Sequence, residues 1–130
     1  MPKRVLDVGN CVPDHAAIRR MLASTYGVEV LQSHGPEDTR AVLERGGIDL
    51  VLVNRKLDQD YSDGIEIIQQ MKRDPALSGI PVMLITNYAE HQEAAVALGA
   101  EYGFGKLELA AEKTHERLRK ILAPRSDATE

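Results

Sequence analysis

The chain has 130 residues, a formal net charge of −4, 43% hydrophobic residues and 28% charged residues. This length fits one domain with one core, and the dispersed basic residues argue against a nucleic-acid-binding surface. No apolar run reaches the roughly 20 residues that cross a bilayer, so we expect no membrane span. The single cysteine, Cys11, cannot form an intrachain disulfide, which is compatible with a cytoplasmic location.

Five short apolar runs alternate with helical patterns along the chain. The runs cover residues 5–8, 28–31, 49–53, 81–85 and, more weakly, 101–104. Because the stronger runs are rich in Val, Leu and Ile without strict alternation, they suit parallel strands that are covered on both faces.

Helix signals separate these runs. Pro13 suits the first turn of one helix, Gly35-Pro36 opens a second, and Asp63-Gly64 precedes a third. Residues 89–98 form a short alanine-rich helical pattern, and apolar residues from Leu107 to Leu122 recur at helical spacing. The alternation predicts an α/β fold, a doubly wound five-stranded parallel sheet in three layers. We expect the domain to cover residues 1–123, followed by a polar tail at 124–130.

The functional crevice of such a sheet lies at the carboxyl ends of its strands. Those ends are predicted at Gly9-Asn10, Asn54-Arg55, Thr86-Asn87 and Gly105-Lys106. Any chemistry of the protein is therefore expected at these four places.

Several motifs in a fixed order carry a resemblance to a known family. They are the stretch at 71–82 followed by Leu84-Ile85-Thr86, the run at 48–53, Asp63-Gly64, and Leu98-Gly99-Ala100 ahead of Lys106. Over residues 3–123 the chain resembles the CheY-like receiver domain of response regulators, the family of two-component (phosphorelay) signal transduction. The resemblance implies a flavodoxin-like sheet with strand order 2-1-3-4-5.

The resemblance also implies a site, and this sequence departs from it. The family has an acidic pair after strand one, a phosphoacceptor aspartate ending strand three, Thr or Ser ending strand four and Lys after strand five. Its carboxylates hold magnesium. Here Gly9 and Asn10 stand at the acidic pair and Asn54 at the acceptor, while Thr86 and Lys106 are retained.

An asparagine amide is not a phosphoryl nucleophile, and two amides and a glycine remove the anionic ligands that magnesium prefers. We therefore expect a degenerate pseudo-receiver that is not an enzyme, has no catalytic residue and no cofactor, and binds magnesium weakly or not at all. Lys106 is expected to donate to the Asn54 amide oxygen or to backbone carbonyls. In the first helix, we expect Asp14 near the positive end and His15 facing solvent.

The resemblance places the output face on the fourth helix, the fifth strand and the fifth helix. The family's aromatic switch residue is replaced by Gly103. The residues that we predict on this face are Tyr102, Phe104, Arg117 and Arg119. Its partners would be proteins, namely a histidine kinase, another regulator or effector, or a second copy of the chain.

Two acidic features leave alternatives open. Asp7 lies inside the first strand, where it is either a buried carboxylate with a polar partner or a relocated phosphoacceptor. The acidic loop Asp58–Asp63 is either solvated or a site of unorthodox phosphoryl acceptance. A third alternative is a small-ligand module that uses the same crevice.

Overall fold

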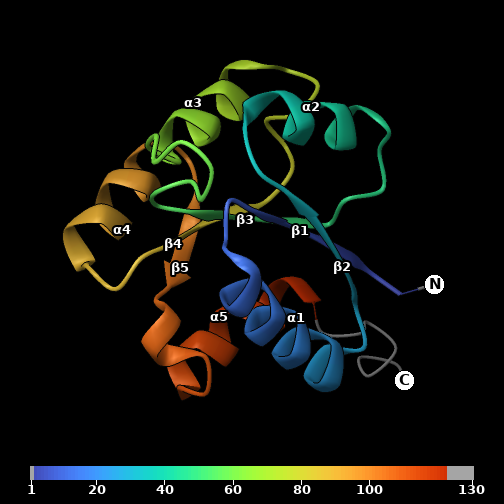
Figure 1. The fold of residues 1–130 in the computed structure, drawn as a ribbon, viewed down its shortest axis with the longest axis vertical. Coiled ribbons are helices and arrows are strands. Elements are labelled where there is room, and N and C mark those ends of the chain that lie inside the picture. Colours follow the sequence, from blue (N-terminus) through green and yellow to red (C-terminus); the bar gives the residue numbers. More distant parts are fainter. Residues whose placement is uncertain (1, 123–130) are drawn as a thin grey trace.

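The computed structural model describes residues 2–122 and contains one five-stranded parallel sheet (Figure 1). The strands are β1 (Arg4–Val8), β2 (Glu29–Ser33), β3 (Leu50–Asn54), β4 (Val82–Ile85) and β5 (Glu101–Phe104). Their order in the sheet is β2-β1-β3-β4-β5, and every neighbouring pair is parallel. The predicted fold class and strand order are confirmed.

Helices cover both faces of this sheet. They are α1 (Val12–Tyr26), α2 (Pro36–Glu44), α3 (Ile65–Arg73), α4 (Ala89–Ala97) and α5 (Glu112–Leu122). Helices α1 and α5 lie on one face, and α2, α3 and α4 lie on the other (Figure 1). Among the described residues, none of the helices is long and apolar enough to span a bilayer.

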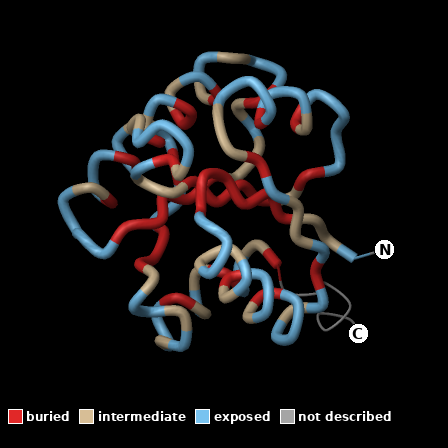
Figure 2. Tube along the Cα trace, viewed as in Figure 1, coloured by how far each residue is buried: buried red, intermediate tan, exposed pale blue. Residues whose placement is uncertain are grey.

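The core has two parts, one on each face of the sheet, and buried residues follow the sheet through the molecule (Figure 2). In β3, Leu50 and Leu52 pack toward α1 and α5, whereas Val51 and Val53 pack toward the opposite helices. Successive side chains of a strand point to opposite faces. An uninterrupted apolar run is therefore what a strand covered on both faces requires.

The segment after β5 differs from the sequence-based prediction. Lys106–Glu108 form a 3₁₀ turn and α5 begins only at Glu112, so the helix expected from Leu107 onward starts later. The Leu107 N–H donates to Asn87 Oδ1 at 3.3 Å, and the Leu107 side chain is 86% exposed. This crossing bond holds the segment against the loop after β4. The tail predicted at 124–130 lies outside the described residues.

Candidate functional site

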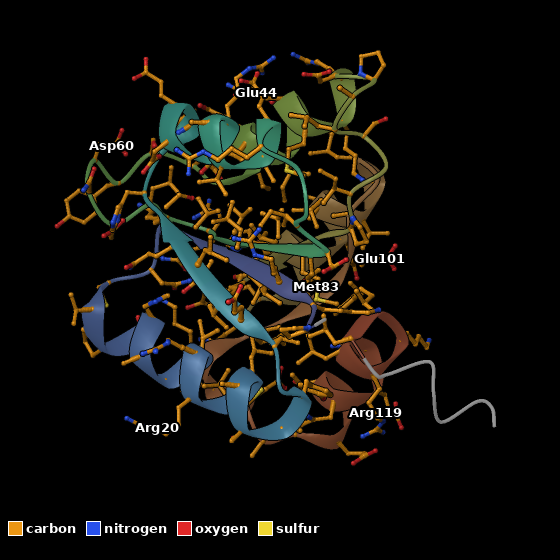
Figure 3. All side chains as sticks on the ribbon, turned by 90° about the vertical axis from the view of Figure 1, so that its right-hand side faces the viewer. Arg20, Glu44, Asp60, Met83, Glu101 and Arg119 are labelled. Atoms are coloured by element: carbon orange, nitrogen blue, oxygen red, sulfur yellow. The ribbon has the colours of Figure 1, made fainter. Side chains whose placement is uncertain are left out.

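An open crevice of about 310 Å³ lies at the carboxyl ends of β3, β4 and β5. It is lined by Asn54, Arg55, Lys56, Ile85, Thr86, Asn87, Tyr88, His91 and Lys106. In Figure 3, Asp60, in the loop after β3, and Glu101, at the start of β5, lie at opposite sides of the molecule. Asp60 lies beyond the carboxyl end of β3, and Glu101 lies at the amino end of β5. The crevice is found at the carboxyl ends of the strands.

Asn54, the last residue of β3, donates hydrogen bonds to the backbone of two loops. Its Nδ2 donates to the Gly9 carbonyl oxygen at 3.1 Å and to the Lys56 carbonyl oxygen at 2.6 Å. A carboxylate has no N–H to donate and would face two carbonyl oxygens at this place. The amide thus ties the loop after β1 to the loop after β3.

Gly9 follows β1 in a backbone conformation that favours glycine. Its φ is +77°, and its N–H donates to the Ser33 carbonyl oxygen at 2.9 Å. A Cβ at this position would lie 2.5 Å from Leu57 Cδ2 and 3.2 Å from Leu57 Cα. The left-handed backbone and the close approach of Leu57 therefore disfavour the side chain that an acidic pair would place here.

Asn10 points away from the crevice into a buried polar cluster. Asn10 and Asp7 are both 0% exposed, and Asn10 Nδ2 donates to Asp7 Oδ1 at 2.5 Å. The other carboxylate oxygen of Asp7 lies 2.7 Å from His15 Nδ1, in α1. Burial raises the pKa of Asp7 above its ordinary value, although the hydrogen bonds from His15 and Asn10 act in the opposite direction.

This cluster changes the assignment of His15. Its side chain is only 16% exposed and contacts Asp7, so the expectation of a solvent-facing histidine was wrong. The geometry of Asp7 agrees with a buried carboxylate that has polar partners. The Asn10 Oδ1 atom is buried and has no hydrogen-bond partner among residues 2–122.

Lys106 has an acidic partner that sequence reasoning missed. Its Nζ donates to Asp14 Oδ2 at 2.7 Å, which corrects the expected bonds to Asn54 or backbone carbonyls. This hydrogen bond from Lys106 holds the pKa of Asp14 below its ordinary value. The available signal was the position of Asp14 in the first turn of α1, because that turn starts at the edge of the sheet where β1 ends.

Thr86, directly after β4, is held by its own loop. Its Oγ1 lies 3.2 Å from His91 Nδ1 and accepts a hydrogen bond of 3.3 Å from the Tyr88 N–H. Both contacts place the hydroxyl on the crevice wall beside the start of α4. His91 was not among the predicted site residues.

Side chains at this edge do not fit a magnesium site. None of the residues lining the crevice, all within the described part of the chain, is Asp or Glu. Residues 2–122 contain no group of three or more His, Cys, Asp or Glu side chains placed to hold a metal ion. Hydrogen bonds from Nδ2 hold Asn10 against Asp7 and Asn54 against backbone, and the neutral amide oxygens of both residues supply no anionic ligand, so we derive no chemical step through a metal.

The acidic loop after β3 makes separate local contacts. Asp58 lies 3.2 Å from His34 Nδ1, Asp60 accepts from the Ser62 N–H and hydroxyl, and Asp63 caps the Ile65 N–H. The three carboxylates do not converge on one point, because each is directed at its own neighbour.

A buried glutamine joins α4 to the two last strands. Gln92 is 3% exposed, its Nε2 donates to the Leu84 carbonyl oxygen at 2.9 Å, and its Oε1 accepts from the Gly103 N–H at 2.8 Å. A Cβ on Gly103 would overlap the Leu84 carbonyl oxygen. Glycine at this position is therefore required by the close approach of β4 and Gln92.

Only some of the predicted output residues lie on the surface. Tyr102 is 38% exposed, and the Arg117 guanidinium lies 4.3 Å from the centre of its ring while donating to the Gly103 carbonyl oxygen at 2.8 Å. Arg119 pairs with Glu112 at 2.7 Å. Phe104 is only 1% exposed and packs in the core beneath α1 and α5, so its assignment to the output face is corrected.

Comparison with known proteins agrees with this fold. Residues 11–107 match the family model of the response regulator receiver domain, starting just after Gly9 and Asn10. No curated protein matches the chain.

Similar solved structures are also receivers. The signal receiver domain of the DNA-binding response regulator merR from Colwellia psychrerythraea 34H is 24% identical with a TM-score of 0.74, over 91% of this chain and 98% of that one. The chemotaxis protein CheY4 of Vibrio cholerae is 16% identical with a TM-score of 0.73, over 94% and 100% of the two chains. The receiver domain of Saccharomyces cerevisiae Ssk1, crystallised with the histidine phosphotransfer protein Ypd1, is 17% identical with a TM-score of 0.69, over 93% and 92%. The chain belongs to the response regulator receiver domain family.

Proposed function

We propose that this receiver acts in two-component signalling without accepting a phosphoryl group, by binding other proteins. One observation carries the proposal. Asn54 occupies the end of β3, the position of the family's acceptor, and its amide donates to the Gly9 and Lys56 carbonyl oxygens. A side chain that is neutral, weakly nucleophilic and engaged in this way does not attack phosphorus.

Exposure to a small phosphodonor tests the proposal. After incubation with acetyl phosphate and magnesium, we expect intact-mass spectrometry to find no covalent phosphoryl adduct on the chain. A receiver that has an acceptor aspartate is the positive control. A stoichiometric adduct would overturn the proposal, and its mapped position would identify the substitute acceptor.

That mapping also tests the two alternative acceptors. Asp7 is 0% exposed and its carboxylate oxygens contact His15 and Asn10, which leaves a phosphodonor no approach to it. Asp58, Asp60 and Asp63 are more accessible, yet none lines the crevice that holds Thr86 and Lys106. An adduct on this loop would therefore form without those two residues.

The α4–β5–α5 face is the proposed contact surface for a kinase, another regulator or a second copy. It contains a cavity of about 190 Å³ whose lining includes Tyr88, Tyr102 and Arg117. Aromatic residues and arginine supply much of the binding energy at protein interfaces. The solved complex of the Ssk1 receiver with Ypd1 supports a protein partner for a receiver of this fold.

Removing one aromatic ring tests this surface. We expect Tyr102→Ala to weaken self-association, or capture of the cognate kinase or regulator, by at least about tenfold, because interface aromatics contribute about 1–2 kcal/mol or more. Tyr61→Ala is the matched control, since Tyr61 is 76% exposed but lies in the loop after β3. Binding would be measured by sedimentation velocity and by pull-down with tagged variants. If only Tyr61→Ala weakens binding, the contact surface lies at the crevice edge instead.

A further inference from the structure

The crevice at the carboxyl edge has the opposite charge from the one that family phosphoryl transfer requires. Arg55, Lys56 and Lys106 line it together with His91, and no described lining residue carries a carboxylate. Carboxylates in such a crevice would repel a free oxyanion unless a cation neutralised them. In this crevice the described lining residues include no carboxylate, so they do not repel an oxyanion.

The cations keep binding capacity for a further anion. Lys56 is exposed and forms no ion pair with any described residue. The Arg55 side chain is 30% exposed, and the Asp63 carboxylate oxygen lies 3.7 Å from Arg55 Nε, beyond hydrogen-bond distance.

The carboxylates that neutralise Arg55 and Lys106 stand outside the crevice lining and are partly solvated. The side chains of Asp63 and Asp14 are 40% and 37% exposed. Exposed ion pairs contribute little to stability because water and salt screen them. Exchange of either carboxylate for an incoming oxyanion is therefore inexpensive.

Neutral donors on the wall complete the arrangement. The Thr86 hydroxyl faces the crevice wall next to His91, and Tyr88 and His91 lie at the start of α4, a helix of nine residues. The positive end of a helix favours an anion and offers backbone N–H groups to it. Hydroxyl, imidazole, ammonium and guanidinium groups together suit the tetrahedral oxygens of phosphate.

We infer that this crevice reversibly binds a phosphate group, free or on a small phosphomonoester, without a divalent metal. No covalent bond forms between the phosphate and the protein, so this inference is independent of whether the chain accepts a phosphoryl group. The Tyr88 side chain is 64% exposed at the rim, and its ring meets His91 edge-on at 5.5 Å between ring centres. It offers an apolar surface for the organic part of a phosphomonoester.

Titration followed by amide NMR tests the inference. Inorganic phosphate and phenyl phosphate would be added separately, at constant ionic strength and with EDTA present. We expect saturable shifts at the amides of Thr86, His91 and Lys106. Tighter binding of phenyl phosphate would identify a small phosphomonoester as the ligand, whereas equal binding would identify the free anion. Binding that appears only with magnesium, or shifts that never saturate, would overturn the inference.

Matched variants separate a built site from general attraction. Lys56→Gln is expected to weaken phosphate binding about fivefold, the effect of one nearby charge, and Thr86→Val is expected to weaken it similarly. Lys120→Gln is the control, because Lys120 lies with Glu101 and Met83 by a different cavity. Equal weakening by Lys56→Gln and Lys120→Gln would overturn the inference. Mass spectrometry after denaturation separates the two proposals, because a reversible ligand is lost while an acyl phosphate remains.

Discussion

Asn10→Asp, which restores one member of the family's acidic pair, is expected to destabilise the domain by about 3 kcal/mol or more at pH 7. The reason is Asp7, whose Oδ1 lies 2.5 Å from Asn10 Nδ2. Both residues are 0% exposed, so the change replaces a buried hydrogen bond by two carboxylates in contact. Urea unfolding followed by circular dichroism measures the effect.

The loss should depend on pH in a defined direction. Burial already raises the pKa of Asp7 above 3.8, and a second carboxylate beside it raises the pKa of the pair further. An acid with a raised pKa in the folded state stabilises the fold only while it stays protonated. The free energy of unfolding of the variant should therefore fall as the pH rises from about 4 to 7, and the gap to the parent should widen.

A double-mutant cycle provides the control. Asp7→Ile introduces an aliphatic residue of the kind found elsewhere in β1 and removes the opposing charge. In that background, Asn10→Asp should cost clearly less than it does beside Asp7. Equal costs in the two backgrounds would contradict this account of the buried cluster. We therefore expect an acid at position 10 to be tolerated better when Asp7 is replaced.

Gly103→Ala is expected to destabilise the domain by about 2–4 kcal/mol. The added Cβ would overlap the Leu84 carbonyl oxygen, and it would lie 3.2 Å from Gln92 Oε1. The first neighbour is backbone of β4, so relief requires β5 or α4 to move and weakens the bonds that Gln92 makes. Unfolding in urea at pH 7 measures the loss.

Gly79→Ala is the matched control for this change. Gly79 has no neighbouring atom within 4 Å of an ideal Cβ and lies in the loop before β4. Its replacement should change the free energy of unfolding by no more than about 0.5 kcal/mol. Similar losses at the two glycines would show that the close approach of β4 at Gly103 is unimportant.

The sequence by itself determined the fold class, the element order and the residues at the strand ends. These follow from local features, because apolar periodicity distinguishes buried strands from helices and glycine or proline marks their limits. Asn54 could be placed at the end of β3 from the run at 50–53 alone. The family could be recognised because its motifs keep their order along the chain.

Only the tertiary structure decided which side chains meet. Asp14 and Lys106 are 92 residues apart in sequence and pair because α1 and the segment after β5 start at the same edge of the sheet. Asp7 and His15 meet because one side of β1 faces α1. Such contacts join separate elements and leave no periodic signal in the sequence.

The two aromatic residues of β5 show the same limit. Tyr102 and Phe104 are two residues apart, so a regular strand would place both on one face. Both side chains do lie on the side of the sheet that α5 covers, since Tyr102 contacts Arg117 of α5 and Phe104 packs with Ile18 and Leu118. Which of the two is buried depends on how α1 and α5 cover the outermost strand β5, and Phe104 is 1% exposed whereas Tyr102 is 38% exposed.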